Sequence, residues 1–299
     1  MALSILSNSA ASSAAFSLNK NSAMLQKSLN RLSSGKKITT PADDAGGLAV
    51  SMKLSSAITR NRSVISNIQN ALSFAEVQDG ALTSAATIVN RMAELKSMSQ
   101  DVIKSSSDKA NYNVEFQALQ TQLHSIASEG FNGVTLFSSE SGKTFGTNVV
   151  NVTIFTSDLG ANGSTVSLGK ALLISALTFA SGTSTAAAAA EASGSKSLAV
   201  ASTATKVSVG ELGVSFFTKA LENIATLRAT NAAGMARLQL AEDHARLTMA
   251  NLEAANSRIM DVDVAEESTR FAKYNILTQA SAAMLSQANQ TSATALLLL

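Results

Sequence analysis

Apolar residues recur at helical spacing near the start of the chain. Leu18, Leu25, Leu29 and Leu32 lie seven, four and three residues apart, so a helix would place them on one stripe. The residues between them are polar or small, apart from Met24. The pattern predicts an amphipathic helix with a narrow apolar face.

The stretch SGKKITTPADDAGGL, residues 34–48, interrupts this pattern. Gly35 suits the left-handed position that ends a helix. Thr40 can cap a new helix, Pro41 suits its first helical position, and Asp43 suits its first turn, where the helix dipole favours a carboxylate. The stretch therefore predicts a joint between two helices, with the second helix beginning at Thr40.

Two longer stretches carry a seven-residue apolar repeat, which is typical of coiled coils. The first continues to about residue 100, and the second begins at about residue 211. Asn231 and Gly234 interrupt the seam of the second stretch, and we expect weak points there that permit alternative packings. The repeat positions are Ile58, Ile65 and Leu72 in the first stretch and Phe217, Ile224, Leu238, Ala245, Leu252 and Ile259 in the second.

A second joint follows in MDVDVAEES, residues 260–268. Asp263 can cap a helix, and Glu266, three residues later, can complete an acidic variant of the capping box. The two joints lie at similar distances from the two chain ends. Paired terminal helices and paired long helices are the simplest arrangement that uses both joints.

The middle of the chain has a different pattern. Val150, Val152 and Ile154 alternate with polar residues between Gly, Asn and Ser turns, as strands do. We therefore predict a mainly α fold of long antiparallel, coiled-coil-like helices formed by both chain ends, with a small, mostly β central insert. Three parts are expected: residues 1–40 with 263–299, residues 41–140 with 211–262, and the variable outer insert, 141–210.

Composition narrows the class of protein. Aromatic residues make up 4% and charged residues 15% of the 299 residues, so the cores are thin and we expect the terminal helices to be disordered in an isolated monomer. The net charge of +2, with both signs interspersed, gives no basic footprint for nucleic acid. No apolar run approaches the roughly 20 residues that span a bilayer, and MALSILSNSA lacks a basic residue before an apolar core. We expect no membrane insertion, and export without a cleaved signal peptide.

Three segments resemble bacterial flagellin. SLNRLSSGKKITTPADDAGGLAVSMKL at 28–54 is similar to its N-terminal signature, and the stretch from ANLEAANSRIMDVDVAEEST onward, at 250–290, to its C-terminal one. EFQALQTQLHSIASEGFNGVTLF at 115–137 adds a third match. The resemblance implies a secreted subunit that self-assembles into the extracellular filament used for swimming. In flagellins the terminal helices line an inner tube, the long helices form the wall around it, and the variable insert faces the medium.

The resemblance also implies partners. They are further copies of the chain in a helical homopolymer, the flagellar export apparatus, a secretion chaperone, and the filament cap and hook-junction proteins. NRMAELKSMSQ at 90–100 resembles the segment that host innate immune receptors recognise. We expect an exposed contact for a receptor or a neighbouring subunit at Arg91, Glu94, Leu95 and Glu115.

Catalytic and cofactor sites are not expected. The chain has no cysteine, and its two histidines, His124 and His244, form no HExxH motif, so neither a thiol nucleophile nor a zinc-protease motif is present. Two alternatives to the filament subunit are a hook–filament junction protein and a cytoplasmic coiled-coil signalling protein. The latter ranks last because it does not explain two matched joints or a β insert.

Overall fold

The computed structural model describes residues 8–138, 145, 150–179, 196–204 and 206–297. The chain forms two compact units. Met1–Thr59 with Met249–Leu299 form one, called the end unit here, and Arg60–Thr248 form the other, the middle unit. The division into three parts stays a prediction, whereas the predicted mainly helical class with a small β insert is confirmed.

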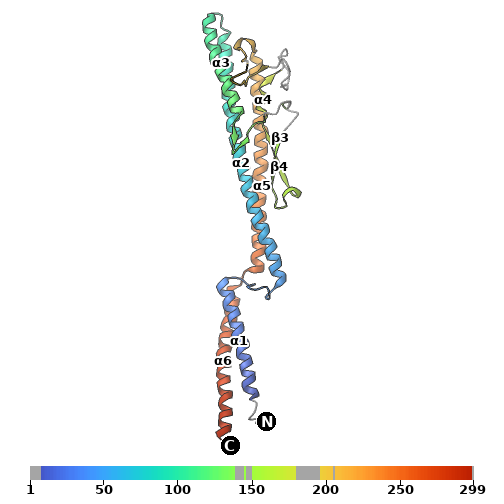
Figure 1. Cartoon of the computed structure of the whole chain (residues 1–299), viewed down its shortest axis with the longest axis vertical. Coiled ribbons are helices and arrows are strands. Elements are labelled where there is room, and N and C mark those ends of the chain that lie inside the picture. The colour runs from blue at the N-terminus through green and yellow to red at the C-terminus, as the bar shows by residue number, and fades with distance from the viewer. Residues whose placement is uncertain (1–7, 139–144, 146–149, 180–195, 205, 298–299) are drawn as a thin grey trace. The chain divides into compact units, whose positions relative to one another are not determined.

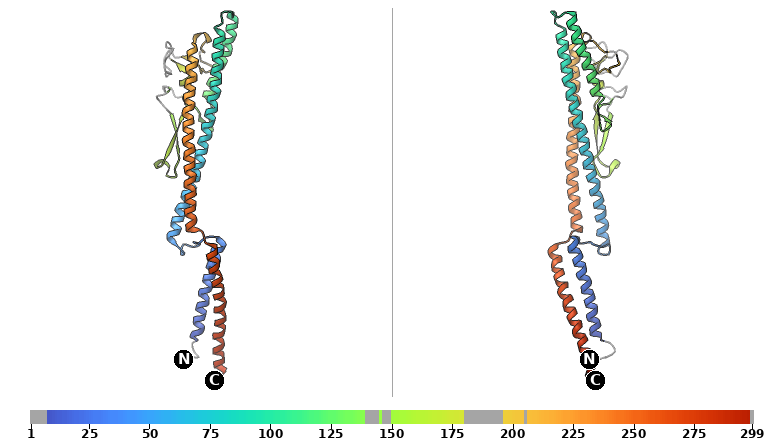
Figure 2. Two further views of the ribbon diagram at one scale, coloured as in Figure 1. Left: turned by 180° about the vertical axis from the view of Figure 1, so that it is seen from behind. Right: turned by 60° about the vertical axis from the view of Figure 1, so that its left-hand side comes forward.

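The end unit is built around two antiparallel helices, α1 (Ser9–Ser34) and α6 (Val264–Leu297), which lie side by side (Figures 1 and 2). Asn8 caps α1 because its Oδ1 accepts a hydrogen bond from the Ala11 N–H at 3.0 Å. The Asn8 Nδ2 donates to the Ala288 carbonyl at 2.9 Å, and the Asn21 Nδ2 donates to the Ser281 Oγ at 2.9 Å. Polar side chains therefore hold the two helices in register.

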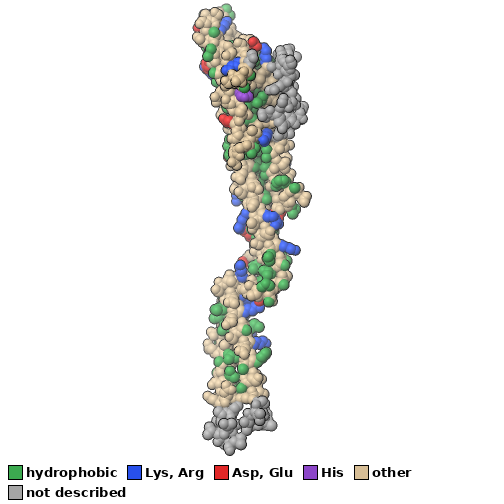
Figure 3. Space-filling model, viewed as in Figure 1, with side chains coloured by type: hydrophobic (Ala, Val, Ile, Leu, Met, Phe, Trp, Pro, Cys, Tyr) green, Lys and Arg blue, Asp and Glu red, His purple; other side chains and the backbone are tan. Residues whose placement is uncertain are grey.

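Few side chains of this helix pair are buried. Ser28 is the buried residue of α1, while the large apolar residues Phe16, Leu29, Ile276 and Met284 are 52–71% exposed. Hydrophobic side chains are visible on the surface over α1 and α6 (Figure 3). The pair thus presents apolar groups to solvent instead of enclosing them.

The middle unit packs α3 (Ser106–Ala127) with most of α2 (Ala45–Ser99) and of α5 (Val214–Met260). A capping box begins α3, in which Ser105 and Asp108 each accept the other's backbone N–H. Phe116 of α3 and Phe217 of α5 meet edge to face with ring centroids 6.1 Å apart. The largest side chains with less than 2% exposure include Phe116, Phe137, Phe217, Ile68, Leu82, Met92, Leu95, Leu123, Leu136, Leu168, Leu173 and Leu177.

A tight hairpin follows α3. Strand β1 (Gly130–Phe131) pairs with β2 (Val134–Thr135) through a turn in which Asn132 and Gly133 both have positive φ, 49° and 78°. This is the backbone of a type I′ turn, which Asn-Gly sequences favour. The helix ends at Ala127, before Gly130, and a Cβ on Gly130 would lie 3.1 Å from the Val134 carbonyl oxygen. Gly130 therefore serves the hairpin and does not end the helix.

The central insert contributes short elements to the middle unit. Strands β3 (Val150–Phe155) and β4 (Thr165–Lys170) form the antiparallel hairpin that alternation predicts. A second pair joins β5 (Thr178–Phe179) to β6 (Lys196–Ser197). The remaining elements are η1 (Gly160–Asn162), α4 (Leu173–Ala176) and η2 (Val209–Glu211). The sequence GTSTAAAAAEASGSKS at 182–197 is low in complexity, and most of it lies outside the described residues.

Asn231 and Gly234 are sites of close contact, and the expectation of weak points that permit alternative packings stays a prediction. The Asn231 Nδ2 donates to the Ala75 carbonyl of α2 at 2.7 Å, and Asn231 is 5% exposed. A Cβ on Gly234 would lie 2.7 Å from the Leu168 Cδ1 of β4. A polar or small residue stands in the seam because another element approaches closely there.

Candidate functional site

The first joint contains a turn before α2 begins. Gly35 follows α1 in the left-handed conformation, with φ of 68°. The Asp43 N–H donates to the Thr40 carbonyl at 3.0 Å, and the Asp43 carboxylate accepts the N–H groups of Thr39 and Thr40 at 3.2 Å each. These bonds close a turn over residues 40–43, with Pro41 at its second position.

The predicted start of α2 was wrong. The helix begins at Ala45, so Thr40 is not its cap and neither Pro41 nor Asp43 lies in its first turn. Asp44 acts as the cap, because its Oδ1 accepts the Gly47 N–H at 2.8 Å. The turn uses Thr40 and Asp43 as local hydrogen-bond partners, which is the alternative role that such residues commonly take.

The second joint begins α6 through Asp263. Its Oδ1 accepts the N–H groups of Ala265 at 2.9 Å and Glu266 at 3.2 Å. The predicted capping box does not close, because the Glu266 carboxylate bonds the Arg270 guanidinium one turn along instead of the Asp263 N–H. Glu266 and Arg270 lie four residues apart on one helix face, which is the spacing that favours an ion pair.

The two joints bond to each other through their backbones. Lys36 and Asp261 form an isolated antiparallel bridge. The Lys37 N–H donates to the Met260 carbonyl at 2.6 Å, and the Val262 N–H donates to the Gly35 carbonyl at 3.1 Å. We call this pairing of residues 35–37 with 260–262 the clasp. Sequence reasoning found both joints but not the bonds between them.

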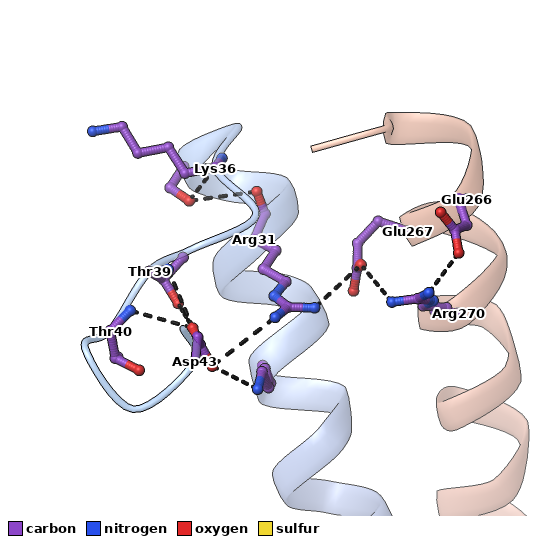
Figure 4. A network of polar contacts seen from close by, with 10 residues as sticks. Arg31, Lys36, Thr39, Thr40, Asp43, Glu266, Glu267 and Arg270 are labelled. Atoms are coloured by element: carbon purple, nitrogen blue, oxygen red, sulfur yellow. Dashed lines mark hydrogen bonds and ion pairs between the residues drawn. The ribbon is translucent and has the colours of Figure 1, made fainter. Parts of the chain in front are cut away.

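An ionic network lies beside the clasp and links α1 to the first joint and to α6 (Figure 4). The Lys27 Nζ lies 2.5 Å from the Asp43 carboxylate. The Arg31 guanidinium lies 3.9 Å from Asp43 and 3.8 Å from Glu267, and Arg270 lies 3.8 Å from Glu267. The side chains of Asp43 and Glu267 are only 7% and 5% exposed, so losing a cation would leave a buried charge uncompensated.

The protonation of Asp43 reflects these contacts. The Lys27 ammonium holds the pKa of the Asp43 carboxyl well below its usual range, and hydrogen bonds from Thr39 and Thr40 lower it further, against the opposing effect of burial. Lys27 and Arg31 lie four residues apart on α1 close to the joint. That spacing indicates a positively charged face on the helix. The sequence alone does not show which carboxylates this face contacts.

The predicted contact on α2 and α3 is only partly exposed. The Arg91 Nε donates to Glu115 at 2.8 Å and its Nη1 donates to Glu94 at 3.0 Å. These bonds, that to Glu115 first, raise the pKa of the Arg91 guanidinium. Leu95 is 0% exposed and belongs to the core of the middle unit, so the expectation that it forms part of an exposed cluster was wrong.

Neither a candidate metal site nor a helix that could span a membrane occurs among the described residues. They include no group of three or more His, Cys, Asp or Glu side chains placed to hold a metal ion. Among them, no helix is both long and apolar enough to cross a bilayer. The network at the joints connects helices, and its carboxylates are already matched to cations or backbone N–H groups.

Comparison with known proteins agrees with this architecture. Residues 5–141 match the bacterial flagellin N-terminal helical region, and residues 214–299 match the bacterial flagellin C-terminal helical region. The chain is 32% identical to the flagellar filament 33 kDa core protein of Treponema phagedenis over 92% of both chains. It is 31% identical to a flagellin of Listeria innocua serovar 6a, over 92% of this chain and 91% of the relative.

A third relative, the flagellar filament 30.7 kDa core protein of Treponema maltophilum, is 32% identical over 90% of both chains. The two matched helical regions contain α1, α2 and α3 at one end of the chain and α5 and α6 at the other. These five helices, both joints and the clasp all lie within the matched regions. The chain therefore belongs to the bacterial flagellin family.

Proposed function

We infer that this flagellin is a structural subunit that self-assembles into the flagellar filament. The observation that carries the inference is the apolar surface of the α1 and α6 pair, where Phe16, Ile276 and Met284 are 65–71% exposed. Large apolar side chains exposed along one helix pair favour association with another surface. Neighbouring copies of the same chain supply that surface in a homopolymer.

The names of the relatives support a filament subunit over a hook–filament junction protein, since they are flagellins and flagellar filament core proteins. Flagellins are a family of structural proteins, and the proposal gives this chain no catalytic role. The filament's stiffness would transmit torque as thrust during swimming.

Assembly of the purified monomer tests the proposal. Monomers mixed with short filament seeds should give long tubular filaments in negative-stain electron micrographs. A variant in which Phe16, Ile276 and Met284 are replaced by serine should stay monomeric, while Leu240→Ser, which changes an exposed leucine of the middle unit, tests whether the effect is specific. Persistent wild-type monomers under these conditions would contradict the proposal and favour the junction protein.

We further propose an extracellular location in the bacterial flagellum, reached through the flagellar export apparatus with a secretion chaperone, and assembly beneath a filament cap on the hook-junction proteins. The chain has no cysteine, so no disulfide opposes passage as an unfolded chain. Deleting the export apparatus should abolish the extracellular protein without removing it from cells. Equal extracellular amounts in both strains would contradict this route.

A contact for a host innate immune receptor or a neighbouring subunit is proposed at Arg91, Glu94 and Glu115. Their side chains are 43–63% exposed and lie on adjacent helices. Arg91→Ala in the monomer should reduce receptor activation, because it removes the cation that orders both carboxylates. Lys219→Ala, which breaks a similar exposed pair with Glu222, is the matched control. Unchanged activation by the Arg91 variant would exclude this contact.

A further inference from the structure

A cavity of about 400 Å³ opens beside the clasp, within the end unit. The end of α1, the loop of the first joint, the start of α2 and the end of α5 enclose it. Charged side chains dominate its wall, with Ile38 as an apolar neighbour. The charged lining residues are Arg31, Lys37, Arg258, Asp43 and Asp44.

The two carboxylates of the cavity already have partners. Asp43 is paired with the Lys27 ammonium at 2.5 Å and accepts the N–H groups of Thr39 and Thr40. Asp44 accepts the Gly47 N–H at 2.8 Å and so lies at the positive end of the α2 dipole. Neither carboxylate serves as a counter-ion for Lys37 or Arg258.

The three cationic side chains of the cavity, Arg31, Lys37 and Arg258, have fewer partners among the described residues than its two carboxylates have. The ion pairs among the described residues involve neither the Lys37 nor the Arg258 side chain, and both residues are exposed. Arg31 is held between Asp43 and Glu267 at distances too long for hydrogen bonds, and its buried Nε has no hydrogen-bond partner. The cavity therefore has donors and positive charge available for one further anionic group.

The shape and polarity of the wall favour a carboxylate carried on a side chain. Ile38, which is 5% exposed, and Ile259 line the cavity beside the cations. Methylene groups of an aspartate or glutamate can pack against these residues while the carboxylate reaches Lys37 and Arg258. A small hydrated inorganic anion would leave that apolar wall uncovered.

We propose that this cavity receives an aspartate or glutamate side chain from a neighbouring copy of the chain in the filament. The inference rests on the proposed function and identifies one subunit contact of the end unit. Charge complementarity gives the contact a defined position, which the apolar surface of α1 and α6 alone does not provide. Arg258 and Lys37 come from opposite ends of the chain, so the docking position exists only where the clasp is formed.

The test compares two double variants with the same change in net charge. Lys37→Gln with Arg258→Gln removes the two unmatched cations of the cavity. Lys20→Gln with Lys53→Gln removes two exposed cations of the end unit that neither line the cavity nor belong to the clasp. The readout is the critical monomer concentration that remains in solution after seeded filaments are sedimented. Arg258→Lys retains the charge and serves as a rescue variant, and circular dichroism of each monomer checks that the middle unit is folded.

The cavity variant should raise the critical concentration roughly tenfold at low salt, which corresponds to about 1.4 kcal/mol. The difference should shrink in about 1 M NaCl, where the Debye length is about 3 Å. The control double variant and Arg258→Lys should stay close to wild type. A cavity variant that assembles like its control would overturn the inference while leaving the proposed function intact.

Two other outcomes identify different errors. If inorganic phosphate at constant ionic strength lowers the critical concentration of wild type but not of the cavity variant, a free anion occupies the cavity and the subunit contact is wrong. A wild-type protein that forms no filaments would instead contradict the proposed function, and the contact with it.

Discussion

The two units have similar helical patterns of apolar residues, but they differ in how much of the apolar surface they bury. In the middle unit, repeat positions such as Ile224, Leu238 and Phe217 are at most 1% exposed, and side chains of α2, α3 and the strands β3 and β4 belong to the same core. In α1 and α6 of the end unit, the described residues that are fully buried are polar or charged, Ser28 and Glu267. Helical periodicity predicts a helix in both cases, but it does not show whether the apolar stripe is covered by the same chain.

This difference separates self-sufficient folding from folding that needs neighbours. Burial contributes about 25 cal/mol per Å² of apolar surface, while ordering the backbone costs roughly 1–2 kcal/mol per residue. A helix that buries almost no apolar side chain cannot offset that cost within one molecule. The middle unit should therefore fold in the monomer, and the end unit should become ordered in the filament.

Hydrogen exchange gives the largest expected contrast. In the monomer, amides of α1 should exchange almost as fast as in an unfolded chain, whereas core amides of α2 and α5 should be protected by about 5 kcal/mol or more. In filaments both sets should be protected. Persistent protection of α1 in the free monomer would show that the end unit folds without neighbours and would remove the basis of the comparison.

Replacing one phenylalanine in each unit by alanine tests whether the middle unit uses its apolar side chains for folding and the end unit uses them for assembly. Phe217→Ala should lower the free energy of unfolding of the monomer by about 3–5 kcal/mol, because its ring is 1% exposed and packs on Phe116. Phe16→Ala, at a position that is 71% exposed, should change that free energy by less than about 0.5 kcal/mol and weaken filament assembly instead. Urea unfolding of monomers and seeded assembly measure the two effects, and the reverse pattern would refute the division of roles.

Glycine substitutions test packing within the middle unit. Gly234→Ala should destabilise the monomer by about 1–3 kcal/mol, because the new Cβ would lie 2.7 Å from the Leu168 side chain. Gly80→Ala, where nothing lies within 4 Å of the new Cβ, should stabilise it by about 0.5–1 kcal/mol. Urea midpoints that move in the same direction for both variants would show that β4 does not pack tightly on α5.

The smallest expected effect concerns pH at the first joint. The pKa of Asp43 is below its ordinary value of 3.8, so the unordered state binds more protons at acid pH and stability rises with pH. The contribution, roughly 1 kcal/mol, should be complete above about pH 5 and be lost as the pH falls through the lowered pKa.

Filament dissociation measured across pH provides the readout. Asp43→Asn should weaken filaments at neutral pH, and its difference from wild type should close on acidification. Glu76→Gln, an exposed change in the middle unit, is the control. A constant difference between the Asp43 variant and wild type at every pH would exclude titration of this carboxylate as the cause.

Local chemistry allowed several features to be predicted from sequence. Apolar spacing indicated the long helices, and alternation at Val152 and Ile154 indicated the β3–β4 hairpin. The start of α2 was misplaced because Thr40, Pro41 and Asp43 suit both a helix start and a turn. These residues form a turn and not a helix start, because the turn lets the Asp43 carboxylate pair with Lys27. That ion pair depends on how α1 lies against the loop.

Long-range pairings could not be predicted from one sequence. The clasp joins backbone groups near Gly35 to others near Met260, and backbone groups are the same for every residue type except proline. Leu95 carried an apolar side chain that suits either a receptor contact or a core, and its burial depends on helices that the local pattern does not place. Asn231 was read as an interruption because its acceptor, the Ala75 carbonyl, lies on another helix.

The clasp also defines a path for mechanical load. Two backbone hydrogen bonds, from Lys37 to Met260 and from Val262 to Gly35, run side by side between segments of opposite direction. Tension applied to α1 thus reaches α6 through these bonds as well as along the covalent chain. The two segments gain a second tether there, made of groups that no side-chain substitution removes except a proline at Lys37 or Val262.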